Sequence, residues 1–161
     1  MSEKSRTRMF FKQLAFAAAI AVSLGACGHE EHPDGAEVNC DLETRDDTYV
    51  ANLEKAGSDV TVALMESTPA PPAKNDNTWR VRVVDVNGAP LSGLSLAVTP
   101  WMPDHGHGTL VAPVVTEQAE AGEYLIEPVN LRMPGLWDVT VEVSDGTGLE
   151  DEVMFSFCIE G

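Results

Sequence analysis

Two histidines and two methionines stand where predicted loops meet predicted strands. His105 and His107 lie two residues apart in a Pro- and Gly-rich run, and Met102 precedes His105 by three residues. Met133 belongs to a second Met-Pro pair further along the chain. Two imidazoles and two thioethers form a soft donor set, which suits Cu(I) best and also admits Cu(II) or zinc through the histidines. The sequence therefore predicts a copper site made of Met102, His105, His107 and Met133.

The same residues also fit a structural or an interaction role. Methionine sulfur at strand ends fills gaps in a core, and loop histidines hydrogen-bond to nearby carbonyl groups. Asp104 suits a turn in which its carboxylate accepts a backbone hydrogen bond. Trp101, in a backbone stiffened by proline, is typical of a surface that contacts another protein. Two further histidines, His29 and His32, lie in a polar, turn-rich stretch that we interpret as solvated tether.

The N-terminus has the three parts of a bacterial lipoprotein signal. Basic residues precede an apolar stretch from Leu14 to Leu24. At roughly 11 residues, this stretch suits a signal peptide and is too short to span a bilayer. Leu24, Gly25 and Ala26 then lead into Cys27, a pattern that predicts cleavage after residue 26 and a lipid on Cys27. An ordinary secretory signal is the alternative, and either signal exports the chain.

Charge excludes one class of partner. Residues 27–161 carry 6 basic and 25 acidic side chains, a net charge of about −19. Such a surface repels phosphate backbones and anionic headgroups, so we expect no nucleic-acid binding and attachment to the membrane through the lipid alone. An acidic monomer is the expected state. Gly28 after the lipidated cysteine favours the outer membrane if the host is Gram-negative, with the protein on the periplasmic side.

Cys40 and Cys158 remain as a pair once Cys27 is assigned to lipid. In an oxidising compartment such a pair is expected to form a disulfide. This bridge would tie the segment before the predicted sheets to the last strand. Two free thiols, available as metal ligands, are the alternative.

From residue 59 onward the pattern is that of β-strands. Apolar residues alternate with polar ones, and turn signals separate the runs. About seven strands favour an all-β fold, an immunoglobulin-like antiparallel β-sandwich with Trp79 and Trp137 as its largest core side chains. A small closed barrel is the alternative. The expected strands are residues 60–64, 79–83, 94–98, 110–115, 124–126, 137–143 and 153–157.

We expect the chain to have three parts: a signal peptide (1–26), a lipid tether with a short N-terminal arm (27–58), and the β-sandwich domain (59–161). Within the arm, residues 41–57 form either one short helix or irregular chain. The Pro-rich residues 67–77 cannot pair inside a sheet and are expected to join two strands.

The two Met-Pro motifs together carry a resemblance to a known family. The chain resembles the YtkA-like domain family in two motifs, MPDHGHG at 102–108 and MPGLW at 133–137. Between them lies Gly122-Glu123-Tyr124, which belongs to the same pattern. That family comprises small exported or membrane-anchored β-sandwich domains, related in pattern to the FixH-like proteins. The resemblance covers residues 78–145. It implies an immunoglobulin-like fold and a link to copper handling, and it leaves the biochemical activity open.

Enzyme motifs are absent from the sequence. It has no Gly-rich phosphate loop and no His-Glu-x-x-His helix, and Ser92 and Ser95 have no base close in sequence. We therefore expect a protein that is not an enzyme. It would bind copper while anchored in the cell envelope, and exchange the metal with a donor or acceptor protein. An envelope interaction module, with the Trp101 loop as its contact surface, is the alternative.

Overall fold

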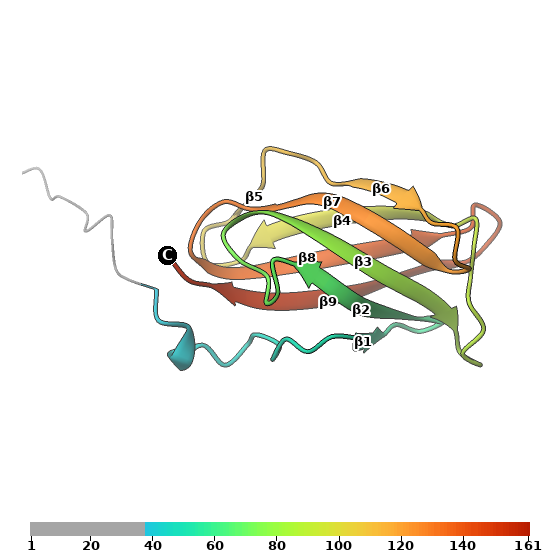
Figure 1. The fold of residues 1–161 in the computed structure, drawn as a ribbon, viewed down its shortest axis with the longest axis horizontal. Coiled ribbons are helices and arrows are strands. Elements are labelled where there is room, and N and C mark those ends of the chain that lie inside the picture. Colours follow the sequence, from blue (N-terminus) through green and yellow to red (C-terminus); the bar gives the residue numbers. More distant parts are fainter. Residues whose placement is uncertain (1–37) are drawn as a thin grey trace, which may run out of the picture. The chain divides into compact units, whose positions relative to one another are not determined.

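A computed structural model describes residues 38–161 of the chain (Figure 1). These residues belong to the compact unit Gly35–Gly161. The predicted signal peptide, the lipid on Cys27 and the tether histidines His29 and His32 lie outside the described residues. Within the described part of the chain, no helix has the length and apolar character needed to cross a membrane.

Two antiparallel sheets make up the fold, as the alternating pattern predicts. One sheet has five strands in the order β1-β2-β3-β7-β6, and the other has four in the order β5-β4-β8-β9. The sandwich is therefore confirmed, with two more strands than the seven expected. The strands are β1 (Leu53–Ala56), β2 (Val60–Thr68), β3 (Asn75–Asp85), β4 (Ser95–Met102), β5 (His107–Gly108), β6 (Val114–Glu117), β7 (Glu123–Leu131), β8 (Gly135–Ser144) and β9 (Glu150–Ile159).

The core lies between the facing sheets. Alternate residues of β2, β3 and β7 meet alternate residues of β4, β8 and β9, because successive side chains of a strand point to opposite faces. Trp79 and Trp137 are both fully buried, as predicted. The ring of Trp79 packs edge-on against Phe155 and Phe157, with ring centroids 5.9 and 5.7 Å apart.

Three local predictions are corrected by the structure. Residues 110–115 do not form one strand: β6 begins at Val114, and Leu110 and Val111 lie exposed in the connection from β5. This connection passes from one sheet to the other, so its apolar residues have no facing layer to pack against. Residues 41–57 form no α-helix, because β1 pairs with β2 in the five-stranded sheet. The predicted Pro-rich connection is shorter than expected: residues 69–74 join β2 to β3, whereas Ser67 and Thr68 end β2 and residues 75–77 begin β3 and pair in the sheet.

The N-terminal arm, described here from residue 38 to residue 52, runs along strand β9. A short 3₁₀ helix, η1 (Cys40–Leu42), opens it. The backbone N–H of Asp47 donates to the Ser156 carbonyl at 2.7 Å, and the Ser156 N–H donates to the Asp47 carboxylate at 2.9 Å. Because β9 is an edge strand, these contacts cover part of an edge that would otherwise be open to pairing.

Candidate metal centre

β4 and β5 place the two histidines at one end of the four-stranded sheet. Met102 ends β4, and it pairs in register with His107 of β5. The backbone N–H groups of His105 and Gly106 both donate to the Met102 carbonyl, at 3.3 and 2.9 Å. Gly106 has φ +67°, a conformation that glycine adopts without steric cost. The turn is therefore fixed by its own backbone and keeps the histidines close together.

The imidazole rings of His105 and His107 lie at a distance that suits a shared ion. Their centroids are 5.6 Å apart and their planes meet at 78°. Two imidazoles that bind one metal have ring centres roughly 4–6 Å apart, since each metal–nitrogen bond is about 2.0 Å long. The His105 side chain is exposed and that of His107 is half-buried. The pair is thus partly open to solvent, and the distance between the rings is compatible with a shared ion.

The contacts of His107 favour one tautomer. Its Nδ1 lies 3.2 Å from the Gly108 carbonyl oxygen and 3.5 Å from Nη2 of Arg132. We assign the proton to Nδ1 from the shorter contact, so that His107 donates to the carbonyl. Nε2 then keeps its lone pair, and a backbone carbonyl orients the ring, as is usual for metal-binding histidines.

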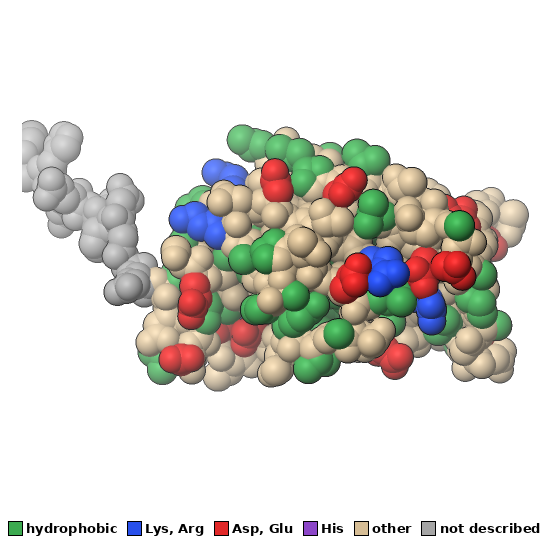
Figure 2. Space-filling model, viewed as in Figure 1, with side chains coloured by type: hydrophobic (Ala, Val, Ile, Leu, Met, Phe, Trp, Pro, Cys, Tyr) green, Lys and Arg blue, Asp and Glu red, His purple; other side chains and the backbone are tan. Residues whose placement is uncertain are grey.

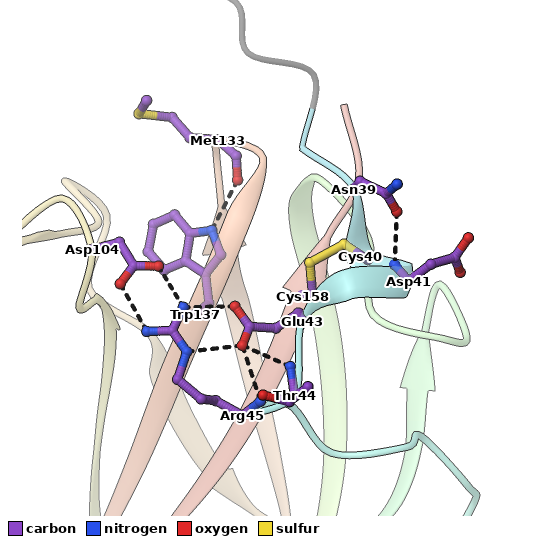
Figure 3. Close-up of a disulfide and its surroundings, with 10 residues drawn as sticks. All are labelled: Asn39, Cys40, Asp41, Glu43, Thr44, Arg45, Asp104, Met133, Trp137 and Cys158. Atoms are coloured by element: carbon purple, nitrogen blue, oxygen red, sulfur yellow. Dashed lines mark hydrogen bonds and ion pairs between the residues drawn. A yellow bond between two sulfur atoms is a disulfide. The ribbon is translucent and has the colours of Figure 1, made fainter.

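The two methionines lie at the same end of the sandwich and differ in burial. Met102 is fully buried, and its terminal methyl lies beside Gly135, where an added Cβ would come within 2.8 Å of it. Met133 is half-buried against the core, and its carbonyl accepts a hydrogen bond from the Trp137 indole at 2.9 Å (Figure 3). The four predicted ligands therefore lie at the end of the sandwich where β4 ends and β8 begins: Met102 is buried, His107 and Met133 are half-buried, and His105 is exposed.

The chemistry of this donor set fits copper better than a hard divalent ion. Within residues 38–161, the His, Cys, Asp and Glu side chains form no group of three that could hold a metal. The donors predicted beside His105 and His107 are the thioether sulfurs of Met102 and Met133. Neutral imidazole and thioether donors suit Cu(I), whereas magnesium and calcium prefer oxygen ligands.

Arg45 reaches from the N-terminal arm to the histidine loop (Figure 3). Its Nη1 and Nη2 donate to the two carboxylate oxygens of Asp104 at 2.8 and 2.7 Å. Its Nε and Nη2 also donate to the Glu43 carboxylate at 2.8 and 2.6 Å. Asp104 immediately precedes His105, so the arm holds the start of the histidine turn through a bidentate ion pair.

A disulfide fixes the arm close to this contact. The Cys40 and Cys158 sulfur atoms are bonded at 2.02 Å, and their Cα atoms are 5.6 Å apart (Figure 3). A cleft of about 280 Å³ lies between the arm and the loop. Its lining joins both parts of the chain: Val38, Asn39, Leu42, Glu43, Asp104, His105, Gly135, Leu136 and Cys158.

The ion pairs hold both carboxylates in the charged form. The side-chain hydrogen bond from Arg45 is the main reason why the pKa of Glu43 falls from 4.5 to about 2. The hydrogen bond from Arg45 also lowers the pKa of Asp104. Conversely, the two carboxylates raise the pKa of Arg45. The carboxylates beside the loop are therefore engaged by Arg45.

Sequence reasoning missed Glu43, Arg45 and Arg132. The contact between Arg45 and Asp104 spans 59 residues, and local pattern carries no signal for it. Arg132 directly precedes the second Met-Pro motif, but the sequence pattern alone predicts no function for it. The sequence did contain one signal for Arg132: the chain has only 10 basic residues, and one of them directly precedes the proposed ligand Met133.

Comparison with known proteins identifies a family. The family model described as YtkA-like matches residues 54–142, which is more than half of the chain. A comparison with curated proteins gives no match.

Solved structures with a similar arrangement of strands are distant in sequence. A DUF4426 family protein from Pseudomonas aeruginosa has a TM-score of 0.48 and 12% identity, covering 67% of this chain and 96% of that protein. FetP from uropathogenic Escherichia coli, produced in the periplasm, has a TM-score of 0.43 and 14% identity, covering 68% and 94%. A copper-bound variant of FetP has a TM-score of 0.43 and 14% identity, covering 69% and 91%.

The family match includes β4, the histidine turn, and the Met133-Pro134 motif, and it ends within β8. It therefore contains all four predicted ligands, and the resemblance inferred from these motifs is confirmed. The chain belongs to the YtkA-like family.

Proposed function

We propose that this protein binds one copper ion, as Cu(I), at the end of its sandwich and carries or sequesters it in the cell envelope. The observation that carries the proposal is the pair of imidazole rings of His105 and His107, 5.6 Å apart, with His107 paired in register to the buried Met102. Met133 is the second thioether at this end. Binding is reversible ligand exchange without bond-making chemistry, so the protein is not an enzyme.

The proposed ligands have distinct tasks. His105, which is exposed, is the entry ligand because a donor or acceptor protein reaches it first. His107 is held through the Gly108 carbonyl and provides an oriented nitrogen. Met102 provides sulfur from the core side, where solvent is excluded. Thioethers are suited to an oxidising compartment, because cysteine thiols there form disulfides.

We further propose that the protein is exported and anchored by lipid on Cys27. The support is the Leu-Gly-Ala-Cys pattern after an apolar stretch, together with a disulfide that persists in oxidising compartments. The proposed location is the periplasmic side of the envelope, at the outer membrane in a Gram-negative host. The proposed partner is a metal donor or acceptor protein.

Cu(I) titration against a chromogenic chelator tests the copper site. The expected result is one equivalent bound by the parent, with affinity lowered at least about a hundredfold in His105→Ala/His107→Ala, since two of the proposed ligands are removed. His29→Ala/His32→Ala is the matched control: it removes the two other histidines and should bind like the parent. Equal, weak binding by the parent and the His105/His107 variant would reject the copper site.

A second candidate function is supported by an exposed apolar surface beside the site. Trp101 is 44% exposed, Leu110 88% and Val114 62%. Figure 2 shows hydrophobic side chains gathered along the upper edge of the molecule, over the connection between β5 and β6. This surface fits an envelope interaction module. Chemical cross-linking in the native envelope would then give a complex that Trp101→Ser/Leu110→Ser abolishes and the His105/His107 variant retains.

A further inference from the structure

Among residues 38–161, Arg132 forms no ion pair with a carboxylate. It follows β7 directly and precedes Met133, and its Nη2 lies 3.5 Å from Nδ1 of His107. Its Nε is buried and has no hydrogen-bond partner among the described residues. The other arginines of residues 38–161 each form an ion pair with a carboxylate: Arg45, Arg80 and Arg82.

The charges around the histidine turn are unlike those of the molecule as a whole. The whole chain has a formal net charge of −16, which attracts any cation. At the turn, Glu43 and Asp104 are engaged by Arg45, and the proposed ligands are neutral. Together these three side chains leave one negative charge at the turn, and Arg132, whose Nη2 lies 3.5 Å from Nδ1 of His107, adds a positive charge directly beside a proposed ligand.

We propose that Arg132 makes this site select a monovalent over a divalent ion. The inference rests on the proposed function, because it assumes that the ion binds at His105 and His107. A fixed positive charge repels a bound cation in proportion to the charge of that cation. The repulsion is therefore twice as large for Cu(II) as for Cu(I), with the same ligands and the same geometry. Arg132 is a specificity-determining residue that touches a ligand rather than the metal.

The reduction potential of the bound copper measures this selectivity directly. When an electrode supplies one electron, Cu(II) becomes Cu(I), and the potential reports the ratio of the two affinities. In Arg132→Gln the repulsion is lost, so Cu(II) gains more affinity than Cu(I) and the potential falls. We expect a fall of about 59 mV, which corresponds to a tenfold change in the affinity ratio for a one-electron couple.

Two matched variants separate charge from packing. Arg132→Lys keeps the positive charge and should keep most of the parent's potential. Lys74→Gln removes another cation that has no ion pair among residues 38–161, and it is exposed, so the potential should stay unchanged. All proteins are purified from the envelope as the full chain, loaded with copper, and checked for folding by near-ultraviolet circular dichroism.

Each outcome decides a different claim. An unchanged or raised potential in Arg132→Gln would overturn the selectivity of Arg132 while leaving the copper site intact. An equal fall in Lys74→Gln would also overturn it, because the effect would then follow from net charge alone. If the parent protein shows no Cu(II)/Cu(I) redox signal at the electrode, the proposed function would instead be rejected.

Discussion

Single residues at the end of the sandwich determine how the side chain of Met102, a proposed copper ligand, is packed. Gly135 shows this most clearly. It begins β8 with φ +126°, and an added Cβ would lie 2.8 Å from the terminal methyl of Met102. The missing side chain leaves room for the methyl group of Met102. Packing of this residue therefore controls the position of a proposed ligand.

Substitution of Gly135 by alanine should destabilise the fold. The strained backbone and the contact with Met102 together should lower the free energy of unfolding by about 1–3 kcal/mol, measured by urea denaturation. Gly146→Ala is the control, since φ there is +71° but nothing lies within 4 Å of the added Cβ. It should lose less stability. An equal loss in both variants would show that the contact with Met102 contributes nothing.

The N-terminal arm positions the histidine turn at the scale of whole elements. Within the arm, Arg45 donates hydrogen bonds to both Asp104 and Glu43, and Cys40 forms a disulfide with Cys158 of β9. The arm therefore connects the last strand of the sandwich to the start of the turn. This connection makes the geometry of His105 sensitive to events in the arm.

Low pH should release the arm from the loop. The pKa of Glu43 is lowered from 4.5 to about 2, so its contribution is complete above about pH 4.5 and is lost as the pH falls towards 2. The backbone N–H groups of Thr44 and Arg45 donate to Glu43, at 2.9 and 3.0 Å. Their hydrogen-exchange protection factors should fall over that range. Glu43→Gln should abolish this dependence, and its persistence in that variant would contradict the assignment.

Loss of the disulfide should lower the free energy of unfolding more than loss of any ion pair. The bridge closes a loop with a sequence separation of 118 residues. In the chain-entropy model a loop of this length stabilises the fold by about 5 kcal/mol. Cys40→Ser/Cys158→Ser should therefore show a much lower denaturation midpoint in urea. An unchanged midpoint would mean that contacts such as Asp47 with Ser156 hold the arm by themselves.

The limits of prediction from sequence follow from how far apart the interacting residues lie. Alternation of apolar residues identified β2, β3 and β8 because one face of each packs against the other sheet. The same rule failed at residues 110–115, since an apolar run also occurs in a connection that passes between sheets. The histidines were visible as a local motif. Arg45 was not, because its partner Asp104 is brought near by the fold alone.

At the scale of the whole molecule, the acidic sandwich follows an N-terminal segment for which we propose a lipid anchor. The charge of residues 27–161 attracts metal cations and repels anionic membrane surfaces. We therefore propose that attachment comes from a lipid on Cys27. The described residues begin only 11 positions after Cys27, so the proposed tether is short.

Replacement of Cys27 should release the protein from the detergent-rich phase. In Triton X-114 partition, the parent should enter the detergent phase because acyl chains supply hydrophobic free energy. Cys27→Ser should lose the lipid and its mass, as seen by mass spectrometry of the intact protein. Cys40→Ser/Cys158→Ser is the control and should stay in the detergent phase. A parent without added lipid mass would contradict the anchor.

X-ray absorption at the copper edge tests the central claim most directly. For the Cu(I)-loaded protein, we predict a mixed shell, with two imidazole nitrogens at about 2.0 Å and at least one sulfur at about 2.3 Å, the bond lengths typical of these donor atoms on zinc. His105→Ala/His107→Ala should lose the imidazole signal. A shell of nitrogen and oxygen without sulfur, or the same spectrum in the double variant, would contradict a site built from the histidine turn and the buried methionine.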